Sequence, residues 1–148
     1  MVAYNKINYF VQALVMGNIN ISTTSGHLMS VLLTNTLPTS TYQTSTDVAG
    51  ELAAGNGYST GGTTFNTTSC VQTAGTLKAI GPAAGVVFTA GPGTIGPFRY
   101  PVLADHSTAY GGNPLVIAWY DYGSSITLNS GETFTVTFDP SSGILQIT

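Results

Sequence analysis

Charged residues are scarce in this sequence of 148 residues: Asp, Glu, Lys and Arg make up 6% of it, against about 25% in an average soluble domain. Only Lys6, Lys78 and Arg99 carry positive charge, and the net charge is −3. Three scattered cations cannot neutralise a row of phosphates or hold an anionic bilayer, so the composition argues against nucleic-acid and membrane partners. Ser, Thr, Asn and Gly fill the polar positions, and copies of such a neutral surface repel one another little. This favours a protein that works within an assembly.

Groups with reactive chemistry are equally few. Cys70 is the single cysteine, which excludes an intrachain disulfide and a cysteine zinc cluster, and we expect it to be a small buried hydrophobe. His27 and His106 lack the context of a nucleophile elbow, and Asp105-His106 reads as a solvated turn between strands. The acidic residues do not cluster at metal-ligand spacing. We therefore expect no enzymatic activity, no catalytic residues, no cofactor and no metal.

Long hydrophobic runs are also missing. The apolar stretch "YFVQALVMG" near the N-terminus is short and broken by Gln12. It lacks the cationic start and long apolar centre of a secretion signal and the ~20 residues of a membrane span. The sequons at Asn20 and Asn66 are then expected by chance in a Thr-rich chain. The chain is expected to stay in the cytosol until it is assembled.

One helical period is present, near the N-terminus. Apolar residues at i, i+3, i+4 and i+7 predict an amphipathic helix over about residues 5–16 that packs on the body of the protein. Asn5 would be its N-cap and Gly17 its C′ residue. The expected buried stripe consists of Ile7, Phe10, Val11 and Leu14.

From about residue 27 onward the pattern becomes that of short strands. Turn clusters such as "GPAAG" and "DPSSG" separate the apolar or alternating runs. The expected strands cover 27–34, 63–71, 75–80, 86–90, 97–104, 114–122, 132–138 and 143–148. Many short strands with regular turns predict an all-β protein: a single domain over 1–148 that folds as an antiparallel β-sandwich or small barrel.

Two details of this fold can be predicted further. The last two strands read as a hairpin around "DPSSG", with Phe134, Val136 and Phe138 on its buried face and threonines on the other. Residues 35–62 carry no strand signal, and Asp47 could cap a brief helical turn through "VAGELAAG".

The stretch "ELAAGNGYSTGG" at 51–62 raises the question of a ligand-binding loop. A phosphate-binding loop would follow a strand, precede a helix and carry a lysine, and none of these signals is present. Asn56-Gly57 is instead a strong turn pair, and Gly61-Gly62 permits a second reversal. We interpret the stretch as a shaped connector in which Tyr58 is a plug: its ring packs and its hydroxyl finds a partner.

Aromatic residues are dense in "AWYDYGSS" and "GPFRYP". Period-two alternation puts Trp119 in the core with Ile117 and Leu115, and places Tyr120 and Tyr122 on the opposite face. Exposed rings on a sandwich could stack on sugars, which leaves a carbohydrate-binding module open as an alternative.

Arg99 is the only arginine, on the face opposite to Phe98 and Tyr100. A bidentate contact with Asp121 could fix the register of two neighbouring strands, because guanidinium and carboxylate match as planar forks. Asp105 and Asp139 are rival partners. In a competing interpretation Arg99 reaches outward and anchors a partner protein.

Several of these segments together have the look of a known family. The stretches "VAGELAAGNGYSTGG", "IGPFRYPVLAD", "NPLVIAWYDYGSSITLNSGETFTVTFD" and "GILQIT" resemble a widespread family of small structural proteins of tailed bacteriophages. So do "NKINYFVQAL" at 5–14 and residues 32–38. The resemblance covers almost the whole chain, except that His27, "STAYGGNP" and the Thr-rich region 63–76 are particular to this sequence. It implies a virion protein without catalytic residues.

Three functions follow as hypotheses. The first is a decoration or cement protein that binds the major capsid protein on the outside of the shell, as a homotrimer assembled in the host cytoplasm. The second is a tail or head–tail connector component. The third is the carbohydrate-binding module for host attachment.

Overall fold

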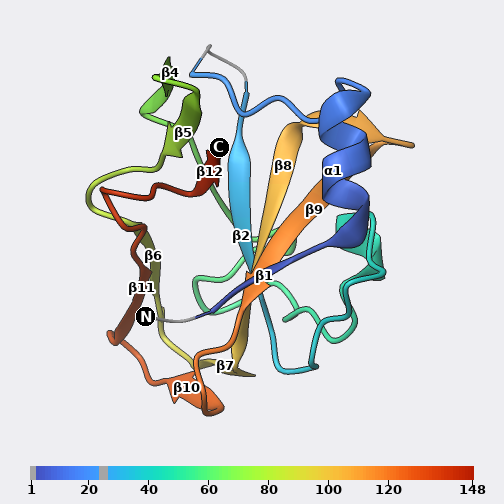
Figure 1. Cartoon of the computed structure of the whole chain (residues 1–148). Coiled ribbons are helices and arrows are strands. Elements are labelled where there is room, and N and C mark those ends of the chain that lie inside the picture. The colour runs from blue at the N-terminus through green and yellow to red at the C-terminus, as the bar shows by residue number, and fades with distance from the viewer. Residues whose placement is uncertain (1–2, 24–26) are drawn as a thin grey trace.

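The centre of the protein is a five-stranded antiparallel sheet with the order β1-β9-β8-β2-β3 (Figure 1). The computed structural model describes residues 3–23 and 27–148, the latter without the side chains of residues 107–110. The strands of the central sheet are β1 (Tyr4–Lys6), β2 (Met29–Thr34), β3 (Thr63–Phe65), β8 (Tyr100–Tyr110) and β9 (Asn113–Tyr120).

Three small antiparallel sheets form a second layer beside the central sheet, in the left half of Figure 1. They are β12-β5-β4, β11-β6 and β10-β7. Their strands are β4 (Ser69–Thr73), β5 (Thr76–Ile80), β6 (Val86–Thr89), β7 (Ile95–Phe98), β10 (Ile126–Leu128), β11 (Thr133–Val136) and β12 (Leu145–Ile147). The all-β, sandwich-like expectation is confirmed, and among the described residues the sheets do not close into a barrel.

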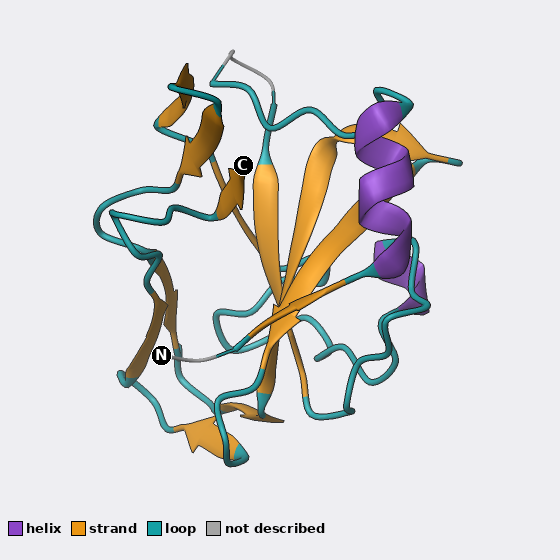
Figure 2. Cartoon of the chain, viewed as in Figure 1, coloured by secondary structure: helices purple, strands orange, loops and turns teal. Residues whose placement is uncertain are grey.

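The central sheet is covered on both faces. All six residues of β2 are buried, and so are the four central residues of β9, Leu115 to Ala118. Such continuous apolar runs are typical of strands buried on both sides. Helix α1 (Asn8–Val15) and the 3₁₀ turn η1 (Ser45–Asp47) contact β9. Figure 2 shows the helix on one side of the sheet and the small sheets on the other.

Helix α1 begins later than predicted, and Asn5 is not its N-cap. Residues 4–6 instead pair with β9, and the side-chain amide of Asn5 donates to the carbonyl oxygen of Ala3 at 3.1 Å. Ile7 occupies the N-cap position. The N–H of Asn8, which has no partner within the helix, donates to the carbonyl of Ser40 at 2.9 Å. At the other end Gly17 has a φ of +72°, so its predicted role after the helix is confirmed.

The buried face of the helix is only partly the predicted stripe. Ile7, Phe10 and Ala13 are buried, Leu14 is half-buried, and Val11 is 46% exposed. Because successive residues turn by about 100° around a helix, the face that meets β9 takes Phe10 and Ala13 and leaves Val11 outside. Including Val11 in the stripe was wrong.

The predicted C-terminal hairpin is also wrong. Its alternation is present: Phe134 and Val136 are half-buried, and Thr133 and Thr135 are exposed. However, β11 pairs with β6 and β12 pairs with β5. The "DPSSG" segment closes a local loop in which the N–H of Gly143 donates to the carbonyl of Asp139 at 2.6 Å. The chain then continues along the next strand of the second layer, where free backbone edges are available for pairing.

Other strand boundaries also differ from the prediction, and β10 was not predicted. Strand 63–71 is split into β3 and β4, and strand 97–104 into β7 and β8. Strand β8 runs on to Tyr110, so Asp105 and His106 lie in a strand and not in a solvated turn.

Asp47 does not start a helical turn through residues 48–55. It ends η1 and completes a capping box with Thr44, because its Oδ2 accepts from the N–H groups of Gln43 at 2.9 Å and Thr44 at 2.8 Å. These hydrogen bonds, that of Thr44 foremost, lower the pKa of the Asp47 carboxyl. The chain then turns at residues 49–50, where Gly50 has a φ of +65°, and Glu51 forms a bridge with Thr34 beside β2.

We expect Phe10→Ala to destabilise the protein by about 3–5 kcal/mol, since it empties a buried site between α1 and the sheet. The matched control is Val11→Ala on the exposed side of the same helix, with an expected change within about 0.5 kcal/mol. Urea unfolding of both variants measures the difference. Equal losses would mean that the helix does not pack on the sheet through Phe10.

Candidate functional site

The glycine-rich segment 51–62 is packed against both layers of the sandwich. Asn56 has a φ of +52° and Gly57 one of +97°, and Gly55 and Tyr58 exchange both backbone hydrogen bonds at 2.9 Å, as in a type I′ turn. A Cβ atom on Gly57 would lie 2.2 Å from the carbonyl oxygen of Thr89. The close approach of backbone to backbone leaves no room for a ligand here, and the connector interpretation holds.

Tyr58 is the plug that the sequence predicts. It is 4% exposed and its ring stacks on Phe88 of β6, with centroids 6.1 Å apart. Its hydroxyl accepts from the N–H of Leu33 at 3.0 Å and donates to Oε1 of Glu51 at 2.8 Å. Burial raises the pKa of the Tyr58 hydroxyl.

Sequence reasoning missed the partner, Glu51. Its Oε1 also accepts from the N–H of Gly61 at 2.6 Å, so one carboxylate oxygen holds both the tyrosine and the second reversal. Glu51 is the only charged residue of the 51–62 stretch. A lone acid in a loop full of free backbone N–H groups is a signal that could have identified it.

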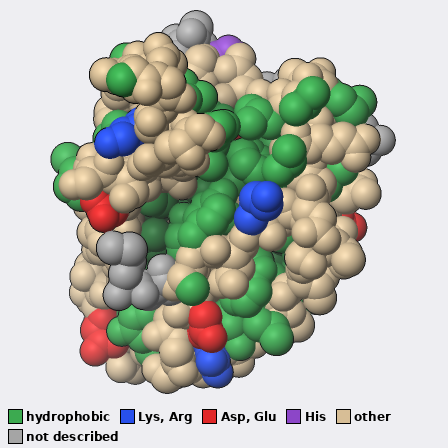
Figure 3. All heavy atoms as spheres, viewed as in Figure 1, with side chains coloured by type: hydrophobic (Ala, Val, Ile, Leu, Met, Phe, Trp, Pro, Cys, Tyr) green, Lys and Arg blue, Asp and Glu red, His purple; other side chains and the backbone are tan. Residues whose placement is uncertain are grey.

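A groove of about 700 Å³ opens where the edge of the central sheet faces the edge of the second layer. Tyr4 of β1 and Tyr120 of β9 form one wall. The other wall comes from residues 137–146, with Phe138 and Ile144 among its apolar side chains. Figure 3 shows a hollow with hydrophobic side chains in the middle of this face. This groove is our candidate functional site.

Tyr120 and Tyr122, both singled out from the sequence, lie at this surface. A smaller pocket of about 150 Å³ continues from the groove, shares Tyr120 and Thr137 with it, and includes Tyr122. Tyr122 is 48% exposed and packs edge-to-face on Phe134, with ring centroids 5.5 Å apart. Burial raises the pKa of Tyr120, and that of Tyr4 to about 12.

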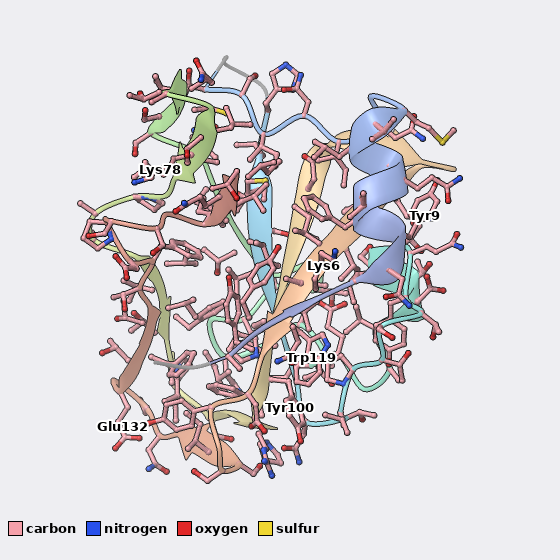
Figure 4. All side chains as sticks on the ribbon, in the orientation of Figure 1. Lys6, Tyr9, Lys78, Tyr100, Trp119 and Glu132 are labelled. Carbon is pink, nitrogen blue, oxygen red and sulfur yellow. The ribbon has the colours of Figure 1, made fainter. Side chains whose placement is uncertain are left out.

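Trp119 is half-buried, packs against the core, and meets Tyr100 edge-to-face with centroids 5.8 Å apart (Figure 4). The simple alternation expected for this strand does not hold. The pairing of β8 with β9 shifts register between Leu103 and Ala104, and the four residues 115–118 are all buried. A bulge of this kind interrupts the period of two.

Arg99 and Asp121 form the predicted bidentate pair. Nε of Arg99 donates to Oδ1 of Asp121 at 2.7 Å, and its Nη2 donates to Oδ2 at 2.8 Å. The contact with Arg99, followed by the N–H of Gly123, lowers the pKa of the Asp121 carboxyl, and the same contact raises the pKa of Arg99. The guanidinium also lies 5.2 Å from the ring centroid of Tyr100. The pair ties the end of β9 to the start of β8.

The remaining polar candidates do not line either hollow. Asp105 is fully buried, and its Oδ2 accepts from the N–H of Asn20 at 2.8 Å. The backbone N–H of His106 donates to the carbonyl of Leu28 at 2.7 Å. Cys70 on β4 is free and half-buried, not fully buried as expected. Within residues 3–23 and 27–148, no three His, Cys, Asp or Glu side chains come together to hold a metal ion.

Comparisons of this chain with protein-family models, with curated proteins and with solved structures give no match. None of the helices in the described part of the chain has the length and apolar character needed to cross a bilayer.

The Arg99–Asp121 pair makes stability depend on pH. Because the pKa of Asp121 is lowered on folding, the pair stabilises the fold above the ordinary carboxyl value of 3.8, and this contribution is lost as the pH falls through the lower, folded-state pKa. We expect Asp121→Asn to lower the melting temperature at neutral pH and to match the wild type well below pH 3.8. A melting-temperature difference that does not change with pH would contradict the ion pair.

Proposed function

We propose that this chain is a structural protein of a tailed-phage particle, a decoration or cement protein that binds the outside of the major capsid shell as a homotrimer. The observation that carries the proposal is the groove between the two layers. It is a concave, mainly apolar groove with a volume of about 700 Å³, on a protein in which only 6% of the residues are charged. Apolar hollows of this size on a surface are typical of binding sites.

The surroundings of the groove favour a protein partner over a reaction. Its lining residues include one ionisable carboxylate, Asp139, whose Oδ1 already accepts from the N–H groups of Ser141 at 2.6 Å and Ser142 at 3.3 Å. The aromatic residues Tyr4, Tyr120 and Tyr122 supply the contact area that interfaces commonly use. A carboxylate that already accepts two backbone N–H groups, beside tyrosine side chains, offers binding contacts without an evident nucleophile or base.

The phage assignment draws on the resemblance of the sequence to small virion proteins. A neutral surface suits dense packing among many copies, and a symmetric oligomer is an economical way to cover the repeated sites of a shell. The expected partners are the major capsid protein and further copies of the chain. The expected location is the virion.

A carbohydrate-binding module is the second candidate, because Tyr4 and Tyr122 are 38% and 48% exposed and could stack on sugar rings. Binding of the purified protein to a glycan array would favour this candidate, and a protein that ignores every glycan on the array would remove it.

The test of the main proposal is the number of copies in purified phage particles, measured by quantitative gel or mass spectrometry against the major capsid protein. A decoration protein that follows the repeated sites of the shell is expected in amounts on the order of hundreds per particle. A few to some tens of copies would instead indicate a connector or tail component. Particles without the protein would refute the structural role.

A further inference from the structure

We propose that the groove binds an extended segment of a partner polypeptide, which adds as a strand to the free edge of β12. The segment would have apolar side chains at alternate positions and at least one carboxylate. This inference rests on the proposed function, in which the groove is a protein-binding surface. It names the shape and chemistry of the partner.

The first support is the pair of sheet edges that border the groove. Strand β12 is the outer strand of its sheet, and β1 is the outer strand of the central sheet. Tyr4 of β1 and Leu145 and Gln146 of β12 all line the groove. An outer strand presents unpaired N–H and C=O groups, which are a template for another strand.

The register shows which backbone groups of β12 lack a strand partner within residues 3–23 and 27–148. A two-residue turn precedes β5, so the backbone N–H and C=O groups of Thr76 are directed towards β4. Backbone groups alternate in direction along a strand, so those of Leu77 and Ala79 are directed towards β12. The backbone N–H and C=O groups of Lys78 are therefore directed away from β12. Its register partner Gln146 accordingly directs its own N–H and C=O outward from the sheet, at the groove.

The opposite edge has the same property. The N–H of Ile7 donates to the carbonyl of Ile117 at 3.0 Å, and Lys6 is in register with Ala118. In this arrangement the backbone groups of Tyr4 and Lys6 point away from β9. The groove thus lies between two strand edges, and a partner that can satisfy an edge while filling an apolar hollow is an extended chain with alternating side chains.

Charge around the groove gives the second support. Lys6 and Lys78 are two of the three cations of the whole sequence, and they lie on opposite sides of the hollow (Figures 3 and 4). Nζ of Lys78 donates to the carbonyl of Ser141 at 2.8 Å, beside the wall of the groove. Lys6 is exposed. Asp139 is the one carboxylate among the residues that line the groove, so the two lysines outnumber the acids around it. A partner segment that carries a carboxylate complements this balance better than a basic segment does.

The test is selection from a random dodecapeptide library displayed on yeast, with the purified full-length protein as bait. The variant Thr137→Arg carries a large side chain at an exposed position that lines both hollows. Peptides that still bind this variant bind elsewhere on the protein and are discarded. Thr133→Arg, exposed on β11 and outside both hollows, is the matched control and should bind as the wild type does. Circular dichroism and melting curves verify that both variants fold.

Supporting peptides alternate apolar and polar residues, lack proline in the middle and carry an acid. Binding of such a peptide should slow hydrogen exchange at the amide of Gln146. The affinity for the peptide should fall about tenfold in Lys6→Gln. It should remain unchanged in Gln12→Glu, which changes the net charge by the same amount on the exposed side of α1.

Peptides with apolar residues at helical spacing, proline-rich peptides, or no peptide sensitive to Thr137→Arg would overturn the inference. Unchanged exchange at Gln146 would overturn the strand addition. The measurement uses isolated protein and peptides, so its result is independent of the copy number that tests the phage role.

Discussion

One tyrosine contacts both layers of this protein. The ring of Tyr58 stacks on Phe88 in the second layer, while its hydroxyl accepts a hydrogen bond from Leu33 in the central sheet and donates one to Glu51. Glu51 in turn fixes the turn at Gly61. Tyr58 and the hydrogen bond from Leu33 are buried, while Glu51 and Gly61 are half-buried. In a low-dielectric interior a satisfied polar network is strong and an unsatisfied one is costly. The glycine-rich connector around Tyr58 therefore helps to hold the two layers together.

The function proposed for the molecule depends on this arrangement. Along the β3 side the layers are in contact, since β3 meets β6 and Phe65 packs 5.3 Å from Phe138 between ring centroids. Along the β1 side they remain apart, and the groove fills the space between the β1 and β12 edges. A sandwich that is held together at one side and open at the other exposes part of its apolar interior. Covering such an apolar surface with a partner lowers the free energy.

Sequence reasoning reached the elements that depend on local signals. The turn at Asn56-Gly57, the buried role of Tyr58 and the strands with clear alternation are readable because backbone φ preferences and period-two patterns are local. The Arg99–Asp121 pair could be proposed because one arginine has few partners. What failed depends on long-range pairing: β11 and β12 joined β6 and β5, Asn5 was drawn into a strand, and Asp105 was buried inside β8. The groove was missed for the same reason, since its walls come from opposite ends of the chain.

The most direct test of this account is the stability of Tyr58→Phe, which keeps the ring on Phe88 and removes only the hydroxyl. Leu33 N–H and Glu51 would each lose a buried partner, so we expect a loss of about 1–3 kcal/mol in urea unfolding, together with faster hydrogen exchange at the Leu33 amide. Tyr122→Phe, which removes a hydroxyl from a half-exposed ring, should change stability by less than about 0.5 kcal/mol. Equal stability of Tyr58→Phe and the wild type would contradict the claim that this hydroxyl joins the two layers.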